Sequence, residues 1–132
     1  MKKSMFKFIL LPLCFVLFST QCEEDIPPIT KENEQEELAL LKAEIEDLAG
    51  TSICDDAFEC KFIAFGSKPC GGPWSYLVYS TSIDIETLET MVEGYNKREA
   101  LYNTNWNITS DCAVVNPPIS ISCENNTCIA IY

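Results

Sequence analysis

Residues 61–80, KFIAFGSKPCGGPWSYLVYS, hold two short apolar segments separated by a run of turn-forming residues. The outer segments, residues 61–65 and 76–80, combine aromatic and branched side chains, which favour strands. The middle segment, residues 66–74, concentrates glycine and proline, which favour turns. The stretch therefore predicts two strands joined by a compact loop.

A helix is expected directly after these strands, over residues 84–102. Asp84, or Ser82 just before it, is the expected N-cap. The apolar side chains recur at helical spacing and define one face. These side chains are Ile85, Leu88, Val92, Tyr95 and Tyr102.

The chain ends in a predicted hairpin, with strands at residues 119–123 and 128–132 around the four-residue turn ENNT. Strands, a helix and a further hairpin in this order indicate an α+β fold. We expect a small, disulfide-stapled antiparallel sheet with one packed helix, formed by residues 51–132.

A separate helix is predicted over residues 31–50, because a narrow apolar stripe recurs there within an acidic sequence. We interpret it as a stalk that lifts the domain off a membrane. A short coiled coil for oligomerisation is the alternative, but fewer than three heptads are present. The preceding residues 22–30 form an acidic tether. The stripe consists of Leu38, Leu41, Ile45 and Leu48.

Six cysteines lie in the domain, an even number, and a domain of this size needs covalent support. We expect three disulfides. Cys123 and Cys128 could pair across the hairpin turn, but each could also reach Cys112, Cys60 or another cysteine. Zinc is disfavoured, and no metal is expected, because the chain has no histidine and no C-x-x-C pair. The six are Cys54, Cys60, Cys70, Cys112, Cys123 and Cys128.

The N-terminal residues 1–21 have the pattern of a secretory signal, with lysines followed by an apolar run too short to span a bilayer. The boundary STQC, which ends at Cys22 and precedes an acidic run, resembles the start of Bacteroidota-type lipoproteins. That resemblance implies acylation of Cys22 and export to the outer membrane, where such acidic residues can mark the cell surface. Gln21 departs from the usual Gly or Ala before the cysteine.

The charge of the chain restricts its partners. All 20 acidic residues but only six basic ones follow Cys22. This field repels a phosphate backbone, so nucleic acid is not an expected partner. It also repels anionic lipid, so the N-terminal lipid rather than a basic patch would make the contact with the membrane.

Several catalytic classes are excluded by composition. Without histidine, neither Ser-His-Asp nor Cys-His catalysis can be built, and the chain carries no phosphate or dinucleotide motif. Carboxylates alone can serve a glycosidase. Asp55, Asp56 and Glu59 are close in sequence, but we interpret them as solvating their loop, since no calcium-binding loop pattern surrounds them. No catalytic residue and no cofactor are therefore predicted.

Residues 68–73, KPCGGP, precede a strand and a helix, and Ser110-Asp111-Cys112 and the pair Cys123 and Cys128 follow. This order resembles an uncharacterised family of small exported, cysteine-rich bacterial proteins with a K-x-C-G-G-P element. The resemblance covers most of the domain. It implies a fold and export, but no reaction and no functional residue.

The same loop is the candidate binding element. Gly71 and Gly72 permit unusual backbone angles, and the loop could offer Lys68 and Trp74 to a partner. The alternative is a tight structural turn in which Trp74 covers the core. A protease-inhibitor loop is a special case of the first interpretation, but Pro69 after Lys68 counts against cleavage there.

The leading hypothesis is a lipid-anchored envelope protein with a non-catalytic binding or structural domain and an unidentified protein partner. The rival hypothesis is a small carboxylate-dependent hydrolase.

Overall fold

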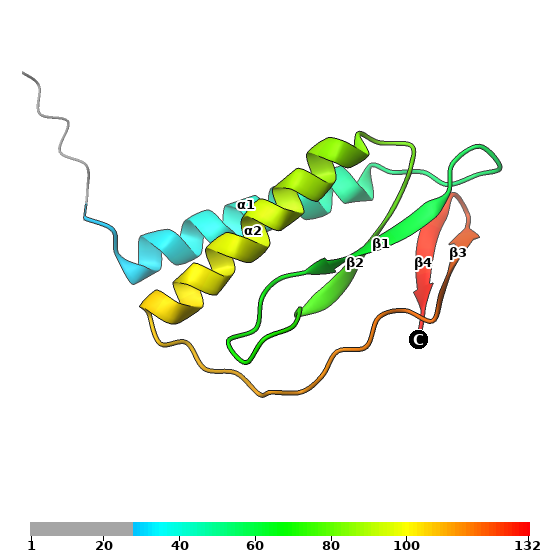
Figure 1. Ribbon diagram of the computed structural model, residues 1–132. Helices are drawn as coiled ribbons and strands as arrows, with labels where there is room; N and C mark the ends of the chain where they lie inside the picture. Colours follow the sequence, from blue (N-terminus) through cyan, green and yellow to red (C-terminus); the bar gives the residue numbers. More distant parts are fainter. Residues whose placement is uncertain (1–27) are drawn as a thin grey trace, which may run out of the picture.

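The computed structural model describes residues 28–132, so the predicted signal peptide and Cys22 lie outside the described residues. Two helices and two antiparallel strand pairs confirm the α+β prediction (Figure 1). The predicted single sheet is in fact two separate two-stranded sheets, β1–β2 and β3–β4. The elements are α1 (Lys31–Gly50), β1 (Cys60–Phe65), β2 (Ser75–Ser80), α2 (Ile85–Asn105), β3 (Ser120–Glu124) and β4 (Thr127–Ile131).

The core lies between the β1–β2 pair and the two helices. Successive side chains of a strand point to opposite faces, and here Phe65 and Tyr79 are buried against the helices. The hydroxyl of Tyr79 donates a hydrogen bond to Glu89 Oε1 at 2.8 Å. Burial raises the pKa of Tyr79 to about 12, and the hydrogen bond to Glu89 and its charge add to the effect. Tyr79 therefore stays a protonated donor at neutral pH.

Helix α1 forms over the predicted residues, with Thr30 as its N-cap. Its interpretation as a free stalk is wrong, because α1 packs against α2 and β2 (Figure 1). Ile45, fully buried, and its neighbours Leu38 and Ala49 belong to the core. The apolar stripe of an amphipathic helix is normally buried against another element, and here α2 and β2 of the same chain bury it. The fold therefore has two packed helices rather than one.

Polar contacts also join the helices. Arg98 Nη2 of α2 donates to Glu37 Oε2 of α1 at 2.6 Å, and Trp106 Nε1 donates to Glu34 Oε2 at 2.6 Å. Asp84 caps α2, as predicted, by accepting a hydrogen bond from the Thr87 amide. Within residues 28–132, neither helix has the length and apolar character needed to cross a membrane.

The C-terminal hairpin has a tighter turn than predicted. Glu124 and Thr127 are paired in the sheet, so the turn consists of Asn125 and Asn126 alone. Both have positive φ, 50° and 63°, which two-residue hairpin turns of this kind require and which asparagine tolerates better than most residues.

The six cysteines of residues 51–132 form three disulfides, as predicted. Cys123 and Cys128 face each other in the hairpin but do not pair. Cys123 bonds to Cys54 and Cys128 bonds to Cys60, while Cys70 bonds to Cys112. The pairing across the turn is wrong because both hairpin cysteines project toward the region that carries Cys54 and Cys60.

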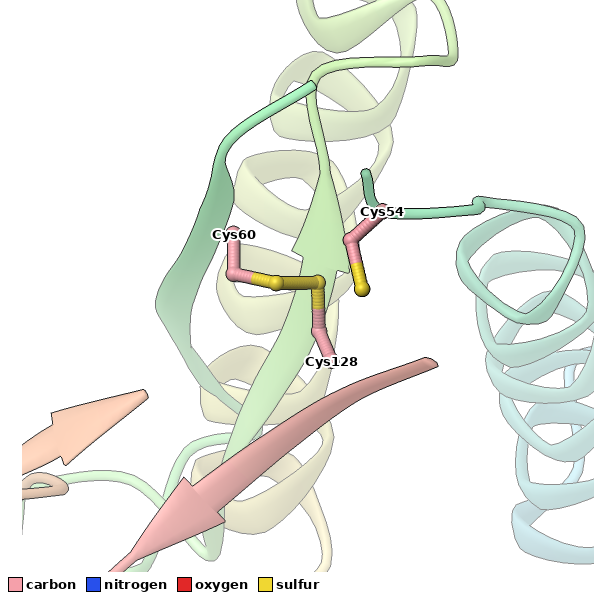
Figure 2. A group of neighbouring side chains, drawn as sticks. All are labelled: Cys54, Cys60 and Cys128. Atoms are coloured by element: carbon pink, nitrogen blue, oxygen red, sulfur yellow. A yellow bond between two sulfur atoms is a disulfide. The ribbon is translucent and has the colours of Figure 1, made fainter. Parts of the chain in front are cut away.

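The first two disulfides lie next to each other and attach the β3–β4 hairpin to the rest of the domain. The sulfur atoms of Cys54, Cys60 and Cys128 lie within 4.8 Å of one another (Figure 2). Covalent bonding accounts for this cluster, since each of the three sulfurs belongs to a disulfide. The Cys54 amide also donates to the Asn126 carbonyl in the hairpin turn at 3.1 Å.

Candidate binding site beside the 66–74 loop

The loop between β1 and β2 is held by its own backbone. The Lys68 amide donates to the Gly72 carbonyl at 2.8 Å, and the Gly71 amide donates to the Lys68 carbonyl at 2.9 Å. Gly66, Gly71 and Gly72 have φ values of 82°, 92° and 80°, which only glycine adopts without strain. The Cys70–Cys112 disulfide ties the loop to the segment after α2.

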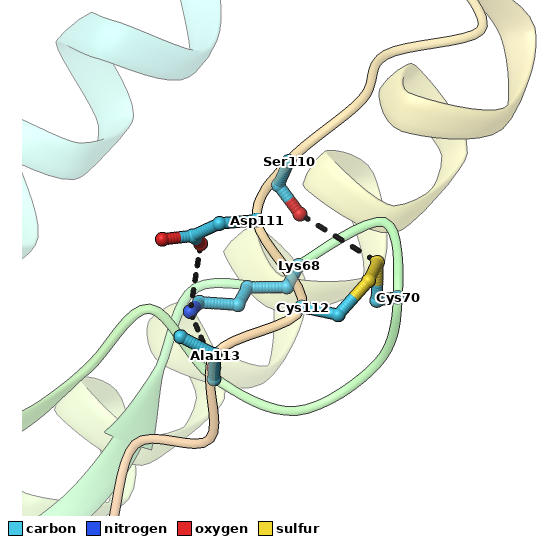
Figure 3. A network of polar contacts seen from close by, with 6 residues as sticks. All are labelled: Lys68, Cys70, Ser110, Asp111, Cys112 and Ala113. Atoms are coloured by element: carbon cyan, nitrogen blue, oxygen red, sulfur yellow. Dashed lines mark hydrogen bonds and ion pairs between the residues drawn. A yellow bond between two sulfur atoms is a disulfide. The ribbon is translucent and has the colours of Figure 1, made fainter.

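Lys68 supports this loop from within. Its Nζ donates to the Ala113 carbonyl at 2.8 Å and lies 3.5 Å from Asp111 Oδ1 (Figure 3). The residue is only 7% exposed. The prediction that Lys68 is offered to a partner is therefore wrong, because its charge is already satisfied inside the protein.

Trp74 is placed differently. It is 41% exposed, although large aromatic side chains are usually well buried. Its ring centroid lies 5.1 Å from Lys68 Nζ, a cation–π contact. Its edge lies against Gly66, where an added Cβ would come within 2.6 Å of Trp74 Cδ1. The indole is thus fixed in position while a large part of its surface remains exposed to solvent.

A pocket of about 420 Å³ lies beside this tryptophan, between α1 and α2. Trp74, Tyr95 and Tyr102 contribute aromatic surface to its lining. Lys31 and Lys42, both on α1, contribute basic groups. An apolar lining with a few convergent polar groups is typical of small-ligand sites.

The polar groups of the pocket are held by hydrogen bonds. Tyr95 donates to Glu99 Oε1 at 3.1 Å, and the Ser67 amide donates to Glu99 Oε2. Tyr102 donates to Gln35 Oε1 at 3.3 Å. Burial, followed by the negative charge of Glu99, raises the pKa of Tyr95 far above its usual range. Both tyrosine hydroxyls and the Glu99 carboxylate therefore have fixed orientations.

The other predicted loop residues lie outside this pocket. Gly71 is exposed and lines a second space of about 390 Å³, to which Lys68 and Asn103 also contribute. Gly72 is exposed. Among the four residues predicted for binding, the described structure thus brings only Trp74 to the pocket between the helices.

Most residues of this pocket were not predicted as site residues. Tyr95 and Tyr102 follow the apolar periodicity of α2, so the sequence assigns them to the core. Lys31, Gln35 and Lys42 belong to the predicted stalk. Their convergence depends on α1 packing against α2, and no local sequence signal reports that contact.

The acidic residues considered as a site remain separate from it. Asp55 Oδ1 accepts hydrogen bonds from the Ala57 and Phe58 amides at 2.7 and 3.1 Å, which forms a local turn. Asp56 and Glu59 are exposed. Among the described carboxylates, Glu99 alone lines the pocket beside Trp74. The chain matches no family model, no curated protein and no solved structure with which it was compared.

Proposed function

We propose that this chain is an exported, lipid-anchored envelope protein whose domain binds a ligand without catalysis, in the pocket beside Trp74. The observation that carries the proposal is the half-open indole of Trp74, held at the pocket by Lys68 and Gly66. A rigid aromatic loses little entropy on binding and is favoured in binding hot spots.

The scaffold under Trp74 supports a role beyond packing. A buried lysine is uncommon in a small domain, because desolvating its charge is costly unless it is paired. Here the Lys68 ammonium is paired and placed beside an aromatic ring that remains half open. A structural turn with Trp74 in the core would need neither arrangement.

The rival functions have less support. A hydrolase of the glycosidase type needs two carboxylates with distinct roles. Among residues 28–132, Glu99 supplies the one carboxylate that lines the pocket, and both of its oxygens accept hydrogen bonds. A protease-inhibitor loop must present its reactive residue to the protease, and Lys68 is buried.

The first test concerns the anchor. We expect the intact mass of protein from the membrane fraction to correspond to a chain that begins at Cys22 and carries acyl groups. Two or more acyl chains are needed for stable anchoring, since each buried CH₂ contributes about 0.8 kcal/mol. Cys22→Ser should move the protein to the soluble fraction. A mature chain that begins elsewhere and does not respond to Cys22→Ser would contradict the lipid anchor and leave the binding proposal standing.

The second test concerns the pocket. Trp74→Ala should reduce capture of a ligand from native envelope extract at least about tenfold, because the side chain forms one wall of the site. The melting temperature, measured in parallel, should fall by only a few degrees. Phe58→Ala is the matched control, since Phe58 is another partly exposed aromatic that lies outside the pocket. Equal capture by the Trp74 and Phe58 variants would contradict the proposal.

A further inference from the structure

The outer edge of β1 is open over part of its length. In an antiparallel pair, alternate residues bond to the partner strand and the residues between them point away. The Thr81 amide donates to the Glu59 carbonyl at 2.9 Å. The amide of the preceding residue, Ser80, instead points away from β1 and donates to Ser52 Oγ at 3.1 Å. By this alternation the backbone groups of Cys60, Phe62 and Ala64 face away from β2.

Asn96 of α2 already occupies one end of this edge. Its Nδ2 donates to the Ala64 carbonyl at 3.1 Å, and its Oδ1 accepts from the Gly66 amide at 2.7 Å. The side-chain amide thus bonds to β1 as one residue of a neighbouring strand would. Beyond it, the backbone groups of Phe62 make no hydrogen bond to other elements among the described residues.

A groove of about 550 Å³ runs beside this edge and shares no lining residue with the Trp74 pocket. Ile63 and Ala64 of β1 form one side, and the exposed Ala100 of α2 contributes further apolar surface. An open strand edge beside an apolar groove is the arrangement that accepts an added strand. The edge supplies main-chain hydrogen bonds, and the groove takes alternate side chains.

The charge around the groove selects the occupant. Glu89, Glu93 and Lys97 line it, and the Lys97 ammonium lies 2.6 Å from Glu93 Oε1. This ion pair has no net charge, so the carboxylate of Glu89 leaves the groove negative. The chain after Cys22 carries 20 acidic residues against six basic ones. A second copy of this chain would therefore be repelled, whereas a basic segment would be attracted.

We propose that the outer edge of β1 binds an extended, positively charged peptide as an added strand. The peptide pairs with Phe62 and the Ala64 amide. It places alternate apolar side chains in the groove beside Ile63 and Ala100, and its basic side chains near Glu89.

The probe for this proposal is a short synthetic peptide of alternating lysine and valine, titrated into the folded protein and followed by amide chemical shifts. The Phe62 and Ala64 amides should shift and become protected from hydrogen exchange. A peptide of the same length with N-methylated alternate amides cannot donate to the edge and should bind at least about tenfold more weakly. A glutamate–valine peptide should not bind, and raising the salt from about 0.05 to 0.5 M should weaken the lysine peptide.

Ala64→Pro is the matched variant in the protein. It removes one outward amide and leaves the β1–β2 hydrogen bonds in place, the position where an edge strand tolerates proline. It should weaken the peptide about tenfold or more while a melting curve still shows a folded domain. If this variant is unfolded, the N-methylated peptide tests the same hydrogen bonds with the unaltered protein. Equal binding of the plain and N-methylated peptides, or edge pairing between two copies of this chain, would overturn the proposal.

Discussion

Replacing the four cysteines of the Cys54–Cys123 and Cys60–Cys128 disulfides with serine is expected to lower the free energy of unfolding by about 7 kcal/mol. The Cys60–Cys128 bond spans a sequence separation of 68, and closing so long a loop restricts the unfolded chain by about 4 kcal/mol. Once the Cys60–Cys128 bond is formed, the Cys54–Cys123 bond closes only a short loop, made of residues 54–60 and 123–128. Closing this loop contributes about 3 kcal/mol. Small domains are stable by about 5–15 kcal/mol, so this variant should be close to unfolding.

Denaturant titrations of the two double variants and the quadruple variant measure this coupling. Removing either disulfide alone should cost about 3 kcal/mol, because the remaining one still closes the long loop. The quadruple variant should lose more than the sum of the two single losses. Strictly additive losses would contradict the idea that the two bonds restrict overlapping parts of the unfolded chain.

Gly66→Ala is expected to destabilise the domain by about 3 kcal/mol, the largest effect of any single glycine replacement. Gly66 has a φ of 82°, which costs an L-residue energy, and an added Cβ would lie 2.6 Å from Trp74 Cδ1 and 3.1 Å from Glu99 Oε2. The new methyl group must displace the indole, so ligand capture should fall together with the melting temperature.

Replacements of two other glycines distinguish the cost of a positive φ from the cost of the contact with Trp74. Gly72 has a similar φ of 80° but no atom within 4 Å of an added Cβ, so Gly72→Ala should cost only about 1–2 kcal/mol. Gly94 lies inside α2 with open space around it, and Gly94→Ala should stabilise the domain by about 0.5–1 kcal/mol. If Gly66→Ala costs no more than Gly72→Ala, then the contact with Trp74 does not hold the indole in place.

Local signals in the sequence predict much of this fold. The caps Thr30 and Asp84 are short polar side chains that satisfy free helix amides, so both helix starts follow from residue type. The even number of cysteines in a small domain predicts three disulfides, but their pairing depends on how the hairpin packs. The two-residue turn at Asn125–Asn126 was missed because asparagine also suits longer turns.

The candidate site was predicted less completely, because its residues gain their roles only through distant contacts. Lysine is seldom buried, so the sequence favours an exposed Lys68. Its burial depends on the Ala113 carbonyl and on Asp111, which the Cys70–Cys112 disulfide brings near. The acidic surface of α1 suggests a solvated rod, although one face carrying Leu38, Ile45 and Ala49 is buried.

The disulfides also determine how the domain responds to a pulling force. Each of the three disulfides in the described residues 28–132 joins residues within the segment 54–128, and α1 lies before that segment. Tension applied between the two ends crosses from Cys54 directly to Cys123, so the intervening chain carries little of the load. Helix α1 is held by non-covalent packing alone and is the helix that detaches first. A domain tethered by its N-terminus would thus lengthen by releasing α1, while the disulfide-linked part keeps its shape.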